Sequence, residues 1–307
     1  MLQENTLGSI RLMKVIVVGA SSFTGRHFCE YAREKGAEVV EANLRYMPWF
    51  PQAKDNYVVN FAAVNVVAPS WDRPLHYMNI NVNRVTEMAR GMIEHMPIRY
   101  VHVSTPEVYG NTGPDNLSEV DWFSPSTPYA VSRAAAEMML KCYYKEYGLP
   151  VVFTRSANAY GPGQQLYRLI PKLIVSIKKG IKFPLEGGGV SKRSFVHVRD
   201  VCDATWRVME GGTPGEAYHI SRGEQYQILG VVQLICEMLG VSPSETYNVV
   251  PERPGKDASY ALSSAKIRRE LDWEPTIDLR YGVAEVIDWV DANWETIKSL
   301  PLEYQYA

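Results

Sequence analysis

Residues 13–25, MKVIVVGASSFTG, decide the fold. They open with a short apolar run rich in β-branched residues, which predicts a buried strand, and they end in glycine and small polar residues. GRHFCEYAREKG follows with the pattern of a helix that ends at Gly36, and AEVVEAN has the composition of a second strand. Residues 13–43 therefore predict a strand, a helix and a second strand in succession.

The same alternation continues through the first half of the chain. NYVVNFAAV, IRYVHVSTPEVYG and PVVFTRSANAYGPG have the pattern of strands, and NINVNRVTEMARGMIEH and TPYAVSRAAAEMMLKCYYKEYG that of helices. The predicted fold class is α/β, a Rossmann-type doubly wound parallel sheet with helices on both faces. Beyond residue 160 loops and shorter elements predict a smaller α/β portion over the carboxyl edge of the sheet, where ligands of such sheets bind.

Size, composition and charge exclude several classes of protein. A chain of 307 residues suffices for one large domain or two modest ones. Its 46% hydrophobic and 21% charged residues are typical of a soluble globular protein. A net charge of −2 gives no electrostatic reason to expect nucleic acid or an anionic membrane as a partner. No apolar run approaches the roughly 18 to 20 residues that span a bilayer, so we expect no membrane association.

The N-terminal residues and the cysteines indicate a cytoplasmic protein. MLQENTLGSIRLMK is polar where a secretory signal would be apolar. The cysteines are widely scattered with no CxxC pair, which favours reduced thiols over disulfides or a zinc site; they are Cys29, Cys142, Cys202 and Cys236. The six histidines also lack the spacing of metal ligands, so we expect no metal centre.

The glycine turn GASSFTG has the features of a phosphate-binding loop. Gly19 and Gly25 lie between a predicted strand and a predicted helix, where the backbone can approach a pyrophosphate and helix amides point at its charge. Ser22 stands where the usual pattern has its middle glycine, which weakens the match. A glycine turn without a ligand is the alternative interpretation.

The end of the second predicted strand bears on the choice of dinucleotide. An acidic residue at this place would hold the adenosine ribose of NAD. The sequence here is EANLRYMP, with Asn43 and Arg45 at the ribose-facing positions. Arg45 is suited to the 2′-phosphate of NADP, and a surface arginine is equally compatible with the pattern. The expected cofactor is NAD, and NADP stays open.

TPYAVSR, residues 127–133, sets a phenol and a guanidinium four positions apart, on one face of a predicted helix. A permanent positive charge at Arg133 stabilises the phenolate of Tyr129 and lowers its pKa, which is one way to make a base near neutrality. The alternative is an ordinary surface pair on an amphipathic helix.

These motifs, in this order and spacing, resemble the extended short-chain dehydrogenase/reductase family, and within it the nucleotide-sugar 4,6-dehydratases and 4-epimerases. GASSFTG is similar to the family's glycine turn, NFAAV to its fourth-strand signature and PYAVSR to its tyrosine motif. RSANAYGPGQ, KRSFVHVRD, GEAYHISRGE and RPGKDASYALSSAKIRRELDWEP resemble the substrate-binding half of dTDP-glucose 4,6-dehydratases. The resemblance implies cofactor contacts by Ser22, Phe23, Ala62 and Ala63, besides the two turn glycines.

The resemblance also implies how the chain is divided. Residues 1–160 correspond to a dinucleotide-binding domain, with a returning strand near residues 194–210. Residues 161–307 correspond mainly to the portion that binds the nucleotide sugar.

The resemblance implies the roles of the tyrosine and the arginine. In the family the tyrosine removes a proton from the sugar 4-hydroxyl while C4 gives hydride to the nicotinamide. A lysine four residues later lowers the pKa of the tyrosine and binds the nicotinamide ribose, and Arg133 stands in its place here. The guanidinium keeps the charge but is bulkier and binds as a fork. We therefore expect the activation of Tyr129 to persist and the ribose contact to change.

STPEVYG, residues 104–110, implies which reaction follows. Thr105 corresponds to the hydroxyl that bonds the 4-oxygen of the sugar, and Glu107 to the glutamate that dehydratases use at C5. An aspartate protonates the leaving hydroxyl in the dTDP-glucose enzymes, and Pro106 replaces it here. GDP-mannose dehydratases are similar in lacking it, so Glu107 is expected to act as base and acid. UDP-glucuronate decarboxylases also carry this glutamate, and a structural glutamate that caps the loop is a further alternative.

The implied substrate contacts come from both halves of the chain. Asn81 corresponds to an active-site asparagine, and Asn158 to the asparagine that contacts the sugar diphosphate. Arg193 and Arg253 correspond to arginines that bind the pyrophosphate, work suited to a bidentate guanidinium. Arg168 occupies a position that is usually basic. A solvated surface arginine is the alternative for each of the three.

One departure from the family concerns the adenine end. Only about 16 residues separate EAN from NFAAV, where the family has a helix and a further strand. We expect that edge strand to be missing or replaced by RYMPWFPQAKDNY. Tyr46, Trp49 or Phe50 would then stack on the adenine or cover the edge of the sheet.

The expected function is an NAD(P)-dependent nucleotide-sugar 4,6-dehydratase, which oxidises C4, removes water across C5 and C6 and returns hydride to C6. A 4-epimerase, which would not need Glu107, and a non-catalytic nucleotide-binding relative are the alternatives. The expected partners are a nucleotide-diphosphate sugar and a second copy of the chain. Helices at residues 79–95 and 129–147 have apolar faces wide enough for a four-helix contact between the two copies.

Overall fold

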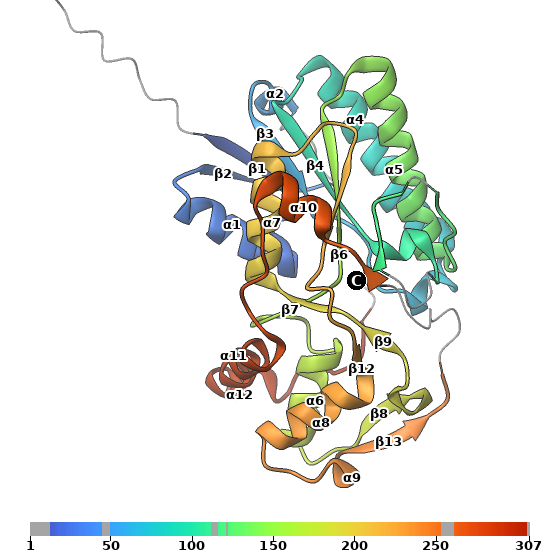
Figure 1. The fold of residues 1–307 in the computed structure, drawn as a ribbon, viewed down its shortest axis with the longest axis vertical. Coiled ribbons are helices and arrows are strands. Elements are labelled where there is room, and N and C mark those ends of the chain that lie inside the picture. Colours follow the sequence, from blue (N-terminus) through green and yellow to red (C-terminus); the bar gives the residue numbers. More distant parts are fainter. Residues whose placement is uncertain (1–12, 45–49, 112–115, 121, 253–260, 306–307) are drawn as a thin grey trace, which may run out of the picture.

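Figure 1 shows a computed structural model of the chain, in which a twisted sheet with its helices lies above a smaller group of helices and short strands. The structure describes residues 13–44, 50–111, 116–120, 122–252 and 261–305.

Six parallel strands form the main sheet, in the order β11-β6-β4-β3-β1-β2. They are β1 (Lys14–Val18), β2 (Glu38–Ala42), β3 (Tyr57–Asn60), β4 (Arg99–Ser104), β6 (Val151–Ser156) and β11 (Ala217–Ile220). The strand order reverses between β1 and β3, which is where open sheets of this kind form a ligand-binding crevice. The predicted doubly wound parallel sheet is therefore confirmed.

Alternating side chains of the strands build a core on each face of the sheet. In β1, Val15 and Val17 belong to one core, and Ile16 and Val18 to the other. The first core is covered by α1 (Phe23–Glu34), α7 (Val198–Gly211) and α10 (Ala265–Leu271). The second is covered by α2 (Phe50–Ala53), α4 (Arg84–Glu94) and α5 (Pro128–Tyr147). Helices on both faces are the arrangement that the alternation in the sequence predicts.

Local signals fix the two helices that matter most for the site. The Ser22 hydroxyl accepts a hydrogen bond from the amide of Gly25 and caps α1. The Thr127 hydroxyl caps α5 in the same way, and Pro128 occupies the first turn, where no amide partner is needed. Gly148 ends α5 in the left-handed conformation, with φ of 70°.

The smaller portion has a hydrophobic core of its own. Its helices are α6 (Leu169–Lys178), α8 (Ile228–Met238), α9 (Pro243–Thr246), α11 (Leu279–Ala292) and α12 (Trp294–Ile297). Short strand pairs surround them: β7 (Asn158–Tyr160) with β10 (Phe195–His197), β9 (Lys192–Arg193) with β12 (Tyr226–Gln227), and β8 (Phe183–Glu186) with β13 (Tyr247–Val250). Another pair, β5 (Asn116–Leu117) with β14 (Ala261–Leu262), lies beside the main sheet's helices.

Short helical turns connect the strands of the main sheet to their helices. They are η1 (Ala68–Ser70), α3 (Pro74–Met78), the π-helical η2 (Asn79–Asn83) and η3 (Pro106–Tyr109), and η4 (Gly187–Gly189) lies in the smaller portion. In the part of the chain that the structure describes, no helix has the length and apolarity to cross a bilayer.

The expected returning strand near residues 194–210 is wrong in its position. β10 there pairs with β7 outside the main sheet, and residues 198–211 form helix α7. The strand that returns to the main sheet is β11, which pairs with β6. The apolar positions of α7 recur at helical spacing, and this helix spans the sheet before the chain enters β11.

The expected shortening at the adenine end is confirmed for the described residues. β2 is the edge of the main sheet, and α2 is the helix that the described residues form between β2 and β3. Arg45, Tyr46 and Trp49 lie outside the described residues, as does the side chain of Phe50.

Candidate functional site

A cleft of about 910 Å³ lies between the carboxyl ends of the main strands and the smaller portion. It is bordered by the glycine turn, the loop after β3, the end of β4, the start of α5, and β7, α6 and β8. Nine predicted site residues line it: Ser22, Phe23, Ala63, Glu107, Tyr129, Arg133, Asn158, Arg168 and Arg193. Residues from distant parts of the sequence therefore meet in one cleft.

A second cavity of about 400 Å³ adjoins the first at the glycine turn. Predicted cofactor residues line it as well: Gly19, Ser22, Asn43, Ala62 and Ala63. Ser22 and Ala63 border both cavities, so the two form one extended depression at the point where the strand order reverses.

The glycine turn is closely packed. Gly19 has φ of 80°, and a Cβ atom there would lie 2.6 Å from the backbone nitrogen of Ala62. A Cβ atom on Gly25 would lie 2.3 Å from the carbonyl oxygen of Gly19. A side chain at Gly19 would clash with the loop after β3, and one at Gly25 would push α1 away from the turn. The glycines thus let the helix N-terminus lie close to the cavity wall. Ser22 acts as the helix cap, which gives the serine in the middle of the motif a local role.

Tyr129 is buried in the first turn of α5. Burial raises the pKa of its phenol above the ordinary value, and the positive charge of Arg133 opposes that rise. Glu107 raises the pKa further, whereas a hydrogen bond with the Thr105 side chain and the charge of Arg168 lower it. The two helix residues are thus coupled in the direction that the sequence predicts, although burial has the larger effect on the tyrosine.

Arg133 is also buried, at 2% exposure, and its guanidinium faces β4. Its Nη2 donates to the carbonyl of Val103 and to Nε2 of His102, at 3.3 Å for the latter. Its Nε and Nη1 atoms have no hydrogen-bond partner among the described groups. Buried guanidinium nitrogens without acceptors are costly, and the same residue lines the cleft.

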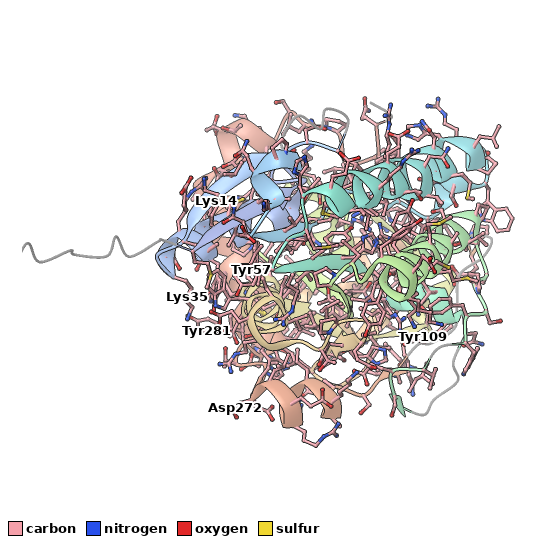
Figure 2. The ribbon with its side chains drawn as sticks, turned by 90° about the horizontal axis from the view of Figure 1, so that it is seen from above. Lys14, Lys35, Tyr57, Tyr109, Asp272 and Tyr281 are labelled. Carbon is pink, nitrogen blue, oxygen red and sulfur yellow. The ribbon has the colours of Figure 1, made fainter. Side chains whose placement is uncertain are left out.

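The turn after β4 positions the threonine and the glutamate. Thr105 precedes η3, and its hydroxyl accepts a hydrogen bond from the amide of Glu107 at 3.3 Å. Pro106 is the first residue of this turn and is buried. Its side chain has no ionisable group, so it cannot take part in proton transfer. Tyr109 ends the turn beside α5 and is labelled in Figure 2.

The predicted substrate residues of the second half lie along the cleft. Asn158 donates from Nδ2 to the carbonyl of Ser194 at 3.1 Å. Arg193 is 9% exposed and donates to its neighbour's carbonyl at 2.7 Å. Arg168 reaches across to the loop after β3 and donates to Oδ1 of Asn65 at 3.0 Å. Arg253 lies outside the described residues.

Asn81 does not have the position expected of a substrate contact. It is fully buried in η2, and its side chain bonds both backbone groups of Val64, with Val64 N to Oδ1 at 2.9 Å and Nδ2 to Val64 O at 3.0 Å. Nδ2 also donates to the Ser132 hydroxyl at 3.0 Å. Both oxygen and nitrogen are thus occupied by the protein, and Asn81 holds Val64, which lines both cavities. In this structure Asn81 supports the wall of the cleft.

The sequence interpretation missed cleft residues near the chain's C-terminal end. Tyr304 lines the cleft, and its ring lies edge-on to that of Tyr167 at 5.2 Å between centroids. Lys172 forms an ion pair with Glu303 at 2.8 Å, which fixes this tail to α6. The only signal in the sequence is an aromatic pair in a short polar tail, which indicates no particular neighbour.

Comparison with known proteins agrees with this geometry. The family model described as GDP-mannose 4,6 dehydratase matches residues 44–286. A dTDP-glucose 4,6-dehydratase of Streptomyces niveus is 34% identical over 245 residues, covering 79% of this chain and 73% of the relative. A dTDP-D-glucose 4,6-dehydratase of Mus musculus is 32% identical over 255 residues, covering 81% and 72%.

Solved structures show the same fold. A crystal structure of the dTDP-glucose 4,6-dehydratase of Streptomyces venezuelae with NAD bound has a TM-score of 0.86 at 28% identity, covering 92% of this chain and 98% of that one. A UDP-glucuronic acid 4-epimerase from Bacillus cereus has a TM-score of 0.86 at 22% identity, covering 91% and 99%, which shows the fold alone. The chain therefore belongs to the GDP-mannose 4,6 dehydratase family of nucleotide-sugar dehydratases, within the extended short-chain dehydrogenase/reductases.

Proposed function

We propose that the protein is an NAD-dependent nucleotide-sugar 4,6-dehydratase. The observation that carries this function is that a phenol, Tyr129, and a carboxylate, Glu107, line one cleft next to the glycine turn. A dehydratase needs a base for the sugar 4-hydroxyl and a second acid–base group for C5 and C6, and these are two groups of that kind. Family membership supports the same reaction.

The residues present fit NAD. The two adjoining cavities form an extended site, and the tight glycine turn places the N-terminus of α1 at their junction, where a pyrophosphate would be stabilised. Asn43 borders the second cavity, at the end of β2, where an adenosine ribose would lie. Arg133 lines the first cavity, where its positive charge would lie beside the nicotinamide end of the dinucleotide. Relatives of known structure contain NAD, which supports this cofactor over NADP.

The chain's own residues would carry the proton transfers. When bound, the nicotinamide ring supplies a reversible hydride acceptor. Tyr129, as phenolate, accepts the proton of the sugar 4-hydroxyl, and Thr105 holds the 4-oxygen. Oxidation at C4 makes the C5 proton removable, and Glu107 takes it. Because Pro106 cannot donate a proton, Glu107 would also pass the proton it took from C5 to the departing C6 hydroxyl, so that water leaves. C6 would receive its hydride from the bound cofactor. C5 would then regain a proton from solvent by way of Glu107, balanced by the proton that Tyr129 releases.

The substrate is a nucleotide-diphosphate sugar. Arg193 and Asn158 line the cleft beyond Glu107, and a buried arginine in such a place suits a diphosphate. Arg168 is a second cation on the same wall. We keep Arg253 as a proposed diphosphate contact on the family resemblance alone.

A 4-epimerase is the second candidate. Thr105 and Tyr129 would suffice for it, and an epimerase of the same fold is among the similar structures. Incubation with GDP-, dTDP-, CDP- and UDP-sugars, followed by mass spectrometry, separates the two. We expect a product lighter by one water. An isomer of unchanged mass would indicate an epimerase, and cofactor binding with no turnover of any sugar would indicate a non-catalytic relative.

We also propose that the protein is a cytoplasmic homodimer that associates through α4 and α5, with residues 79–95 and 129–147 in the contact. α5 leaves several apolar side chains exposed on one element, namely Val131 (43%), Met138 (58%), Met139 (38%) and Tyr147 (56%). Exposed apolar side chains along one helix suit packing against the same helix of a second copy. Light scattering after size exclusion should give twice the chain mass.

A charge placed in this contact tests its location. Met138→Glu should yield a monomer with an unchanged unfolding midpoint. Tyr281→Glu on α11, where the side chain has the same 58% exposure as Met138, is the matched control and should remain a dimer. A wild-type monomer, or dimers in both variants, would contradict the proposed contact.

A further inference from the structure

A row of buried polar side chains runs behind the cleft, from β3 to α5. Asn60, Tyr100, His102 and Arg133 are each at most 2% exposed. The hydroxyl of Tyr100 lies 2.8 Å from Nδ1 of His102, and Nε2 of His102 lies 3.3 Å from Nη2 of Arg133. Asn60 donates from Nδ2 to the Tyr100 hydroxyl at 3.4 Å. Polar groups are thus connected across three adjacent elements.

The chemistry of these groups fixes the state of His102. A guanidinium can only donate hydrogen bonds, so Nε2 of His102 must accept and carries no proton. The proton of the neutral ring is then on Nδ1, which donates to the hydroxyl of Tyr100 at 2.8 Å. The contact of Asn60 Nδ2 with the same Nδ1, at 3.5 Å, then joins two donors and is not a hydrogen bond. Burial and the charge of Arg133 lower the pKa of His102 well below its ordinary value, in agreement with a neutral ring.

The row also reaches the wall of the second cavity. Oδ1 of Asn60 accepts a hydrogen bond from the amide of Ala62 at 2.9 Å, and Ala62 lines that cavity. The guanidinium at the other end borders the first cavity. The row therefore connects the two walls between which the proposed dinucleotide would lie.

We propose that His102 is a positioning residue, which holds the Arg133 guanidinium by its Nη2 edge, beside Tyr129 and at the wall of the first cavity. Without an acceptor at Nε2, Arg133 would keep only the carbonyl of Val103 on its inner side. An arginine side chain held by a single hydrogen bond samples several orientations. The guanidinium charge would then spend less time beside the phenol of Tyr129. This inference rests on the proposed function for its kinetic consequences.

The charged groups around the phenol set the direction of the expected change. Arg133 and Arg168 lower the pKa of Tyr129, and Glu107 raises it. Arg133 and Tyr100 are the ionisable neighbours of His102 itself. If Arg133 is displaced, the pKa of Tyr129 rises, less phenolate is present at a given pH, and the rising limb of the pH–rate profile moves to higher pH.

Two substitutions of matched length test the proposal. His102→Gln keeps an acceptor oxygen near the position of Nε2, whereas His102→Met has similar length and no such acceptor. We expect His102→Met to lower kcat at pH 7 about tenfold, to shift the rising limb upward by about one pH unit and to weaken NADH binding about tenfold. His102→Gln should stay within about threefold of the wild type in kcat and NADH affinity.

A control separates positioning from simple destabilisation. Thr154→Val, on the adjoining strand β6, removes a buried hydroxyl that has no partner among the described groups, and it should change neither the pH profile nor the NADH affinity. Identical pH profiles and NADH affinities for His102→Gln and His102→Met would overturn the proposal. If no sugar is turned over, the proposed function fails, while the NADH comparison still tests the role of His102.

A measurement on the wild-type protein covers the case in which His102→Met does not fold. Nitrogen-15 NMR of histidine-labelled protein should show a ring with a protonated Nδ1 and an unprotonated Nε2, unchanged down to pH 5, whose signals are absent in His102→Gln. His219, whose Nδ1 faces the carbonyl of Ser263, should give a second ring of this kind that remains in the variant. A protonated Nε2 at pH 7 would overturn the proposal without reference to any activity.

Discussion

At the scale of single residues, Tyr129 and Glu107 share one cleft but differ in how the protein positions them. The phenol is buried at the start of α5, where burial raises its pKa and Arg133 opposes the rise. The carboxylate lies on a short turn after β4, in which the backbone amide of Glu107 donates to the hydroxyl of Thr105. The phenol therefore depends on a charge four residues away, and the carboxylate depends on the conformation of a turn.

Replacing the carboxylate tests its role. Glu107→Gln should abolish water loss, because the amide cannot take the C5 proton, and should leave oxidation at C4 detectable as reduced cofactor in a single turnover. The expected fall in the rate of water loss is at least about 100-fold. Absorbance at the nicotinamide band and product mass would be followed together. A variant that still releases water at the wild-type rate would contradict the assignment.

Residue-level prediction succeeded where spacing determines geometry. The four-residue separation of Tyr129 and Arg133 on a helix sets both on one face, and their electrostatic coupling was expected from that alone. The role of Asn81 was not predictable, because its partners Val64 and Ser132 approach it from other elements. His102 was missed for the same reason: a histidine within an apolar strand gives no sign of the arginine that it contacts.

At the scale of elements, the turn η3 is held from behind by a buried ion pair. Arg155 of β6 bonds both carboxylate oxygens of Glu137 on α5, at 3.1 and 2.5 Å, and both side chains are fully buried. Its remaining nitrogen, Nη1, donates to the hydroxyl of Tyr109, the last residue of η3. This hydroxyl also lies 2.8 Å from Nε2 of His219 on β11. Strand, helix and turn are thus joined through one guanidinium.

Breaking this pair on one side should cost far more than removing it whole. Arg155→Met leaves the Glu137 carboxylate buried and unpaired, and we expect a loss of about 3–5 kcal/mol in the free energy of unfolding. The double variant Arg155→Met/Glu137→Leu removes both charges and should recover most of that loss. Urea unfolding at pH 7 measures both. Equal losses in the single and the double variant would contradict the expected cost of the unpaired carboxylate.

Element-level prediction was accurate for the first half of the chain and weaker beyond it. The strands and helices up to β6 alternate regularly, and each strand is a short apolar run that ends in a turn. The segment around α7 was misplaced because FVHV resembles a strand of the main sheet, and indeed forms the short β10, which pairs with β7 instead. The partner of a short strand is decided by tertiary packing, which its own sequence does not encode.

At the scale of the whole molecule, the cleft is closed by segments that come from both portions and from the C-terminal tail. Leu302 is buried in the core of the smaller portion, and the Lys172–Glu303 ion pair lies next to it in sequence. These two contacts hold Tyr304 at the wall of the cleft. Tyr304 lies beyond residues 44–286, which the family model matches, so this wall could not be predicted from the family resemblance.

The tail supplies a prediction at this scale. Tyr304→Ala removes the ring that packs against Tyr167, and an aromatic wall of this kind is worth about 0.5–1.5 kcal/mol. We expect nucleoside diphosphates to bind about three- to tenfold more weakly by calorimetry, with NADH affinity and the unfolding midpoint unchanged. Tyr281→Ala, on the exposed side of α11, is the matched control. Unaltered binding of every nucleoside diphosphate by Tyr304→Ala would contradict a role of the tail in the site.

The central claim is that oxidation at C4, loss of water and reduction at C6 take place in one cleft on one bound sugar. The most direct test is to supply a nucleotide-activated hexose with deuterium at C4 and to locate the label in the product. We predict a 4-keto-6-deoxy sugar, lighter by one water, with the deuterium at C6 and no net reduction of the cofactor. A product of unchanged mass, or one in which the deuterium has been lost from the sugar, would contradict the account.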